Sequence, residues 1–275
     1  METIEYSKAR AKKIILVLTA LASFLLSLNI NAQTKSEAVT KTIQALPHDL
    51  EIQLALSALP PHLRDSATVY ILNPTKGFEL ARKGTNGFHA FVARTGEDAM
   101  RGSWEFTEYR DDILYPISFD ETGSKFQMPV FFDIAAMQAK GMDPKELKKL
   151  IKERYKSNYY KAPDKPGVSY MLSPILRTYV SPDENSKVFT GNVPHIMYYA
   201  PNVTNKDVGG SGSFSPYPHI ILTGAHGYNI QLMGAAEKEA ITKGYEEMLK
   251  KLCAIKEEWC LPATNTKAPE HQHHH

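Results

Sequence analysis

The chain has 275 residues, 43% of them apolar and 23% charged, with 32 basic and 30 acidic side chains. Four of the basic and two of the acidic residues lie in the first 32 positions, so the rest of the chain carries 28 of each and has no net charge. Nucleic acids and anionic membranes require clustered Lys and Arg, so we expect neither as a partner. The length suits one large globular domain or two modest ones.

The first 32 residues have the layout of a secretory signal peptide. Basic residues between positions 8 and 13 precede an apolar run of 15 residues, Ile14–Leu28, and the small residue Ala32 precedes Gln33. The run is shorter than the roughly 20 residues of a membrane-spanning helix. We therefore expect cleavage near Gln33, a periplasmic or secreted protein and no membrane span afterwards, with a retained N-terminal anchor as the alternative.

The first part of the mature chain predicts a helix followed by three strands. Residues 49–59 are rich in Leu, Glu and Ala and end at two prolines, which favours a helix. Extended segments at 67–72, 78–82 and 88–94 are separated by two clusters of turn-forming residues. They predict an antiparallel meander, in which His89 lies among apolar neighbours and packs rather than binds.

The stretch 95–127 is charged and punctuated by glycine, so it predicts a long surface excursion with one strand at 115–119. Within it, Asp120–Gly123 lacks the ligand spacing of a calcium loop and is interpreted as a turn. A helix is predicted at 130–140. A second begins at Asp143, which precedes Pro144 and Glu146 as an N-cap.

The second helix is amphipathic. One face carries Leu147, Leu150, Ile151 and Tyr155, and the lysines at 148, 149 and 152 are expected on its solvated side. After a proline-rich connector, strands are predicted at 168–172, 195–199, 219–223 and 228–233, with a flexible glycine-rich loop at 205–218.

The C-terminal region predicts one long helix over 236–258, whose apolar stripe packs on the sheet. Residues 263–275 form a polar, histidine-rich tail that is expected to be disordered. The predicted organisation is a signal peptide at 1–32, one α+β domain at 33–262, and that tail. In this fold a largely antiparallel sheet is covered on one face by the C-terminal amphipathic helix and the helix pair at 130–156; two sub-lobes meeting near Pro163 are the alternative.

The two cysteines, Cys253 and Cys260, leave their pairing open. Export would place them in an oxidising compartment, which favours a disulfide. However, seven residues of unbroken helix rise about 10.5 Å, and a disulfide tolerates a Cα separation of only about 7 Å. A disulfide therefore requires the helix to end near Ile255; otherwise both are small core residues.

A cluster of polar residues in the second half is the candidate site. The predicted catalytic residues are His195, Asp207 and His226, and the predicted ligand contacts are Tyr198, Asn202 and His219. If the strands that carry them are neighbours, these side chains meet at strand ends beside the glycine-rich loop. Histidines with a carboxylate can form a general base or ligate a metal, but the spacing matches no zinc motif, so no metal ligand is assigned. Ordinary strand-end histidines are the alternative.

The chain has no Gly-x-Ser-x-Gly elbow and no phosphate-binding glycine loop, and nothing in it identifies a cofactor. It has 14 tyrosines, which suit a half-wet binding cleft because the ring packs while the hydroxyl bonds a ligand. We therefore expect a small-molecule binding or sensing module. The alternatives are a hydrolase that uses the His and Asp residues, with or without metal, and an envelope-associated interaction protein. The oligomeric state is not predicted.

Two segments resemble a known group of proteins. Residues 81–88 (Ala-Arg-Lys-Gly-Thr-Asn-Gly-Phe) and 194–202 (Pro-His-Ile-Met-Tyr-Tyr-Ala-Pro-Asn) are similar to segments of uncharacterised exported bacterial proteins. The resemblance implies export and a bacterial source, and it implies no activity.

Overall fold

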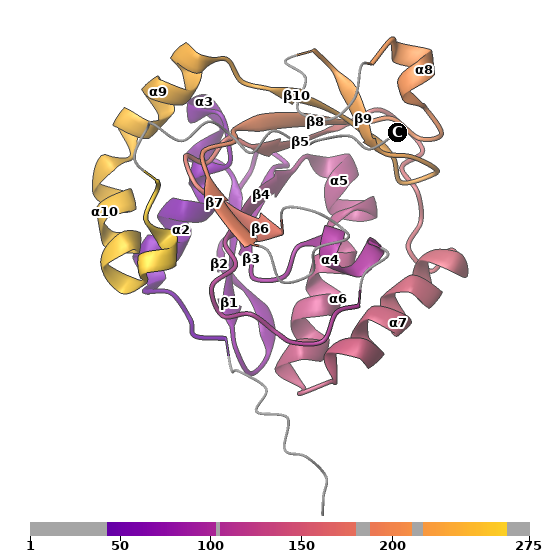
Figure 1. Ribbon diagram of the computed structural model, residues 1–275, viewed down its shortest axis with the longest axis horizontal. Coiled ribbons are helices and arrows are strands. Elements are labelled where there is room, and N and C mark those ends of the chain that lie inside the picture. The colour runs from indigo at the N-terminus through magenta and orange to yellow at the C-terminus, as the bar shows by residue number, and fades with distance from the viewer. Residues whose placement is uncertain (1–42, 103–104, 180–187, 211–216, 263–275) are drawn as a thin grey trace, which may run out of the picture. The chain divides into compact units, whose positions relative to one another are not determined.

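The computed structural model describes residues 43–102, 105–179, 188–210 and 217–262, and these belong to one compact unit (Figure 1). The leader at 1–32 and the tail at 263–275 lie outside these ranges, so what the sequence indicates for them stays a prediction. Within the described ranges, no helix has both the length and the apolar character that a membrane crossing requires.

A large sheet forms the centre of the unit and confirms the predicted α+β class. Its eight strands run in the order β2-β1-β3-β4-β5-β8-β10-β9, and β1–β3 is the one parallel pair among them. The strands are β1 Thr68–Asn73, β2 Gly77–Arg82, β3 His89–Ala93, β4 Tyr115–Phe119, β5 Val168–Met171, β8 His195–Tyr199, β9 His219–Leu222 and β10 Tyr228–Leu232. A separate hairpin, β6 Leu176–Tyr179 with β7 Val188–Gly191, was not anticipated from the sequence.

Helices cover both faces of the sheet. The helices of the described residues are α2 His48–Ser57, α3 Pro61–Arg64, α4 Glu97–Arg101, α5 Glu121–Phe126, α6 Met128–Ala139, α7 Pro144–Lys156, α8 Asn205–Val208, α9 Ala235–Gly244 and α10 Glu246–Ile255, followed by a 3-10 turn, η1 Glu257–Trp259. Apolar residues of α4, α6 and α7 pack with Phe91 and Ile117 on one face, while those of α2 and α10 pack with Val69 and Val92 on the other.

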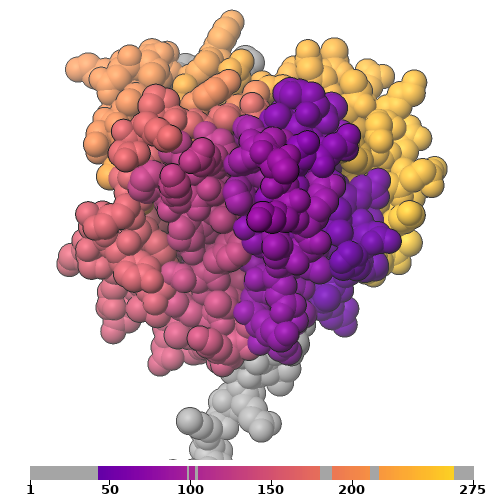
Figure 2. Space-filling view, turned by 180° about the vertical axis from the view of Figure 1, so that it is seen from behind, coloured from indigo at the N-terminus to yellow at the C-terminus, as the bar shows by residue number. Residues whose placement is uncertain are grey.

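The prediction that the C-terminal helix and the helix pair share a face is therefore wrong, because α10 packs on the opposite face from α6 and α7. Figures 1 and 2 both show α10 beside α2, so an N-terminal and a C-terminal helix together cover that face. The single long helix predicted at 236–258 is also interrupted. Tyr245, with φ −125° and ψ 18°, separates α9 from α10.

The first three strands do not form the predicted meander, because β3 pairs with β1 instead of β2. The connection after β2 passes across the start of β1, where the backbone N–H groups of Thr85 and Asn86 both donate to the carbonyl of Ser66. Gly84 makes this crossing possible, since a Cβ at that position would lie 2.3 Å from the same carbonyl oxygen. The chain thus returns on the far side of β1.

The stretch 95–127 is not the surface excursion that its composition suggested. Every residue of β4 is buried at the centre of the sheet, and Phe106, Tyr109 and Ile113 are buried around it. Asp120 begins the helix α5, because its carboxylate accepts a 2.7 Å hydrogen bond from the N–H of Gly123. The turn predicted at 120–123 is therefore the first turn of a helix.

The two helices predicted between residues 130 and 156 are confirmed as α6 and α7. The carboxylate of Asp143 accepts from the N–H groups of Lys145 and Glu146, which is the predicted N-cap. One side chain differs from the expectation, since Lys148 is 6% exposed rather than solvated. Burial lowers the pKa of Lys148 to about 8, and the charge of Lys152 adds to the effect.

The two cysteines form a disulfide, with their Cα atoms 4.4 Å apart. The helix α10 ends at Ile255, and Lys256 is extended, so the chain turns back before it reaches Cys260. This is the helix end that the spacing argument required.

One edge of the sheet is partly closed by a side chain. The amide of Asn205 accepts from the N–H of Ile220 at 2.7 Å and donates to the carbonyl of the same residue at 3.1 Å. It thereby occupies backbone groups of β9 that a neighbouring strand would otherwise bond. Such protection limits unwanted pairing at a sheet edge.

Candidate functional site

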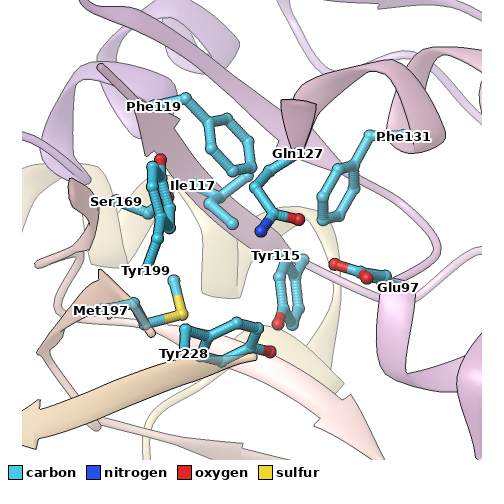
Figure 3. Close-up of a pocket in the computed structure, with 10 residues that line it drawn as sticks. All are labelled: Glu97, Tyr115, Ile117, Phe119, Gln127, Phe131, Ser169, Met197, Tyr199 and Tyr228. Atoms are coloured by element: carbon cyan, nitrogen blue, oxygen red, sulfur yellow. The ribbon is translucent and has the colours of Figure 1, made fainter. Parts of the chain in front are cut away.

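A cavity lies against the face of the sheet that α6 and α7 cover. Its wall combines aromatic rings with a few polar groups: Glu97, Tyr115, Ile117, Phe119, Gln127, Phe131, Ser169, Met197, Tyr199 and Tyr228 (Figure 3). The empty space is about 300 Å³ including its opening to solvent, of which about 10 Å³ admits the centre of a water molecule. A single water requires roughly that much, so the enclosed part of the cavity accepts one water-sized group, and the rest of a larger molecule would have to extend into the opening.

Gln127 is the side chain in this wall whose polar atoms lack partners. It lies at the junction of α5 and α6 and is 3% exposed. Neither its Oε1 nor its Nε2 makes a hydrogen bond within the described structure. Figure 3 shows the amide pointing into the space that the ten residues enclose. A buried amide normally has partners, so this exception requires an explanation.

Gln127 reaches this position because it is the single residue between the end of α5 and the start of α6. Its backbone N–H closes α5 on the carbonyl of Gly123 at 2.8 Å. Pro129 then lies in the first turn of α6, where a residue without an N–H is tolerated. The short joint between the two helices directs Gln127 inward, toward the sheet.

An ion pair lies on one side of the cavity. Arg101 Nη1 donates to Glu97 Oε1 at 2.8 Å, one helical turn apart on α4, and the hydroxyl of Tyr155 donates to the same oxygen. Both charged side chains are largely buried. Burial, followed by the charge of Glu97, raises the pKa of Tyr155 far above its ordinary value, so the phenol stays protonated. The pair is compensated and adds no net charge to the site.

His226 adjoins this ion pair from the turn before β10. Its ring meets the ring of Tyr155 edge to face, with centroids 5.0 Å apart. Burial lowers the pKa of His226, and the nearby charge of Arg101 lowers it further, while the charge of Glu97 and a hydrogen bond to the backbone of Tyr160 oppose this shift. Its Nδ1 is buried without a hydrogen-bond partner in the described structure.

At the other side of the cavity the polar groups are satisfied. The hydroxyl of Tyr199 lies 3.0 Å from Ser169 Oγ, 3.1 Å from the Val168 carbonyl oxygen and 3.3 Å from Asp120 Oδ1. Burial raises the pKa of Tyr199 well above its usual range, so the phenol stays protonated and cannot take the proton of Ser169. This side therefore has a structural arrangement rather than a nucleophile and its base.

The sequence-predicted histidines fall into two groups. His195 and His219 begin β8 and β9 and pair with Leu232 and Ile230 of the strand between them. The Nδ1 of each donates to the carbonyl two residues earlier, at 2.6 Å for His195 and 3.1 Å for His219. Burial lowers the pKa of His195 to about 4. The two rings therefore belong to the interior of the fold.

His226 lies at the opposite end of β10 from His195. Tyr228 pairs with Tyr199 and Leu232 pairs with His195, so the two histidines are separated by more than the length of β8. Five residues of a strand extend about 13 Å, which is too far for one metal ion or one hydrogen-bonded relay. The structure does not bring them into one site.

The remaining predicted residues have other positions. Asp207 is exposed, and its Oδ2 accepts from the backbone N–H and the hydroxyl of Thr204, which caps α8. Asn202, with φ 62°, donates its backbone N–H to the carbonyl of Gly224. Tyr198 is 45% exposed and points away from the face that carries Tyr199. None of the three lines the cavity.

Within the described residues, no three His, Cys, Asp or Glu side chains lie close enough together to hold a metal ion. The cavity itself contributes one carboxylate, that of Glu97, which is already bonded to Arg101 and Tyr155. The site therefore suits a ligand held by hydrogen bonds and aromatic contacts.

Sequence reasoning missed Gln127 and Glu97. Both lie in the stretch 95–127, whose charge and glycine content suggested solvent exposure. A Glu and an Arg four residues apart marked a helix that could carry an ion pair. No local pattern indicated that Gln127 would be buried without partners, because that depends on strands and helices distant in the sequence.

No protein-family model, no curated protein and no solved structure matches the chain. The resemblance of residues 81–88 and 194–202 to exported bacterial proteins therefore stays a prediction.

Proposed function

We propose that the protein is an exported binding module that holds a small uncharged molecule in the cavity beneath the sheet, by hydrogen bonds to the amide of Gln127. The observation that carries this proposal is that Gln127 is 3% exposed and neither polar atom of its side chain has a partner. A ligand that bonds to this amide would replace the water that the amide loses on folding.

Stability alone does not account for Gln127. A buried polar group without partners costs about 1–3 kcal/mol, whereas an apolar side chain of similar shape would cost nothing of the kind. Proteins tolerate such costs at sites where activity requires them. The aromatic wall and the opening to solvent support a binding role.

The hydrolase alternative has less support. It requires His195, Asp207 and His226 to act together, and His195 and His226 lie at opposite ends of β10. The carboxylate of Asp207 is exposed on the surface, where its Oδ2 accepts two hydrogen bonds from Thr204 as the cap of α8.

A thermal-shift screen tests the proposal. Several hundred small uncharged compounds would be added to the wild-type protein, to Gln127→Met, and to Gln138→Met as a matched control. Methionine keeps the length of glutamine and removes both polar atoms. Gln138 lies on α6 and also has a buried, unpartnered Nε2, but it does not line the cavity.

We expect at least one compound to raise the melting temperature of the wild-type protein and of Gln138→Met, but not that of Gln127→Met. The proposal fails if no compound stabilises the wild-type protein. It also fails if every stabilising compound acts equally on Gln127→Met.

A further inference from the structure

The chemistry of the cavity narrows the class of ligand. We infer that the ligand places an alcohol hydroxyl, from a simple alcohol or from a sugar, against the amide of Gln127. This inference rests on the proposed function and assigns the chemical group that enters the site.

The hydrogen-bonding capacity of Gln127 requires a group that both donates and accepts. Its Oε1 can only accept and its Nε2 can only donate, and both are unpartnered in the described structure. A hydroxyl offers a proton to the first and a lone pair to the second. An ammonium group has no lone pair to offer, and a carboxylate has no proton, so either would leave one atom of the amide unsatisfied.

The charge of the site excludes an ionic group. Glu97 and Arg101 neutralise one another at 2.8 Å, and the hydroxyl of Tyr155 adds a further hydrogen bond to the carboxylate. The described wall holds no other charged side chain. A charged ligand group would therefore be taken out of water without a counterion, which is strongly unfavourable.

The size of the cavity distinguishes between uncharged groups. A carboxamide also donates and accepts, but it brings three heavy atoms into a space of about 10 Å³ for the centre of a water-sized group. A hydroxyl brings one heavy atom. The rings of Phe119, Phe131 and Tyr115 surround the Gln127 amide in Figure 3 and fill the rest of that space, so the carbon that carries the hydroxyl would lie toward the opening to solvent.

A series of probes with one carbon body tests the inference. Uniformly ¹⁵N-labelled protein would be titrated with 1-butanol, butyramide, butylammonium and butyrate, and the side-chain NH₂ resonances of Gln127 would be followed by NMR. Gln127→Met assigns those resonances, and Gln138→Met is the matched control. A second arm with methyl glucoside distinguishes a sugar hydroxyl from that of a simple alcohol.

We expect 1-butanol or methyl glucoside to shift the Gln127 side-chain resonances and to bind at least about tenfold more tightly than the other probes, the equivalent of one or two hydrogen bonds. Gln127→Met should lose this binding about tenfold, and Gln138→Met should keep it. Tighter binding of the amide at Gln127 overturns the hydroxyl inference and leaves the proposed function standing. Tighter binding of the ammonium or the carboxylate overturns both, because the proposed ligand is uncharged. If no probe of any class shifts the Gln127 resonances, both fail.

Discussion

The indole N–H of Trp259 donates a 2.7 Å hydrogen bond to the backbone carbonyl of Asp112, 147 residues earlier in the chain. Trp259 is 2% exposed, and the guanidinium of Arg94 lies 5.4 Å from its ring centroid. The carboxylate of Asp112 accepts in turn from Arg110 and Arg177. The disulfide between Cys253 and Cys260 encloses this segment and holds it against α10. The C-terminal segment is thus attached to a buried polar cluster.

Removal of the disulfide should loosen that attachment. For a closed loop of this length, the chain-entropy relation gives a loss of about 2.5 kcal/mol from the free energy of unfolding. The double variant Cys253→Ser, Cys260→Ser should show this loss in urea denaturation, with a red shift in the fluorescence of Trp259. The exposed substitution Ala254→Ser serves as a control. An unchanged unfolding midpoint in the double variant would show that hydrogen bonds alone hold the segment.

Glu51 should make the protein less stable as the pH rises. Burial raises its pKa from 4.5 to about 7, against the hydrogen bond from the Leu72 N–H and the charge of Arg94. The unfolded chain therefore releases the proton at lower pH than the folded protein. The stabilisation of the folded state is complete below pH 4.5, and about 3 kcal/mol of it is lost as the pH rises from 4.5 through 7.

The measurement is the free energy of unfolding against pH for the wild-type protein and Glu51→Gln. The glutamine keeps an oxygen that can accept from Leu72 and does not ionise, so the decline between pH 4.5 and 8 should disappear. The exposed substitution Glu146→Gln should retain the decline. If the free energy of unfolding of Glu51→Gln declined by the same amount, ionisation of Glu51 would not be the cause of the decline.

His195 should make the protein less stable as the pH falls, the opposite of the effect of Glu51. Burial lowers its pKa from 6.5 to about 4, and the charges of His219 and Lys238 add to this effect, while the Val193 carbonyl opposes it. Between these values the unfolded chain binds a proton that the folded protein excludes. The contribution of neutral His195 to the free energy of unfolding is complete above pH 6.5, and about 3 kcal/mol of it is lost as the pH falls toward 4.

Substitution His195→Gln tests this by its effect on the slope of stability against pH. The variant should lose the acid-side decline between pH 6.5 and 4, whatever its absolute stability. His62→Gln, at an exposed position, should keep that decline. An unaltered slope in His195→Gln would mean that another group takes up the proton.

Local rules were sufficient for most elements of the fold. The N-cap at Asp143 and the alternating strands at 195–199 and 228–232 depend on residues close in sequence. The parallel pairing of β3 with β1 could not be read in this way, because it depends on how the connection passes across Ser66. The break at Tyr245 interrupts an apolar stripe that is continuous in the sequence.

The site was harder to predict than the fold. The histidines attracted attention because their side chains can do chemistry, yet His195 and His219 are buried with their Nδ1 atoms bonded to nearby carbonyls. Gln127 stands out because its buried side-chain amide has no hydrogen-bond partner in the described structure. That property arises only when β4, β10, α4 and α6 are assembled around it.

The most direct test of the central claim is the stability of Gln127→Met measured without and with the ligand. If the amide is retained for binding, the ligand-free variant should be more stable than the wild-type protein by about 1 kcal/mol, because the unpartnered polar atoms are gone. The same variant should gain no stability from a compound that stabilises the wild-type protein. A Gln127→Met variant that is less stable without ligand, and that responds to the compound as the wild-type protein does, would contradict the account.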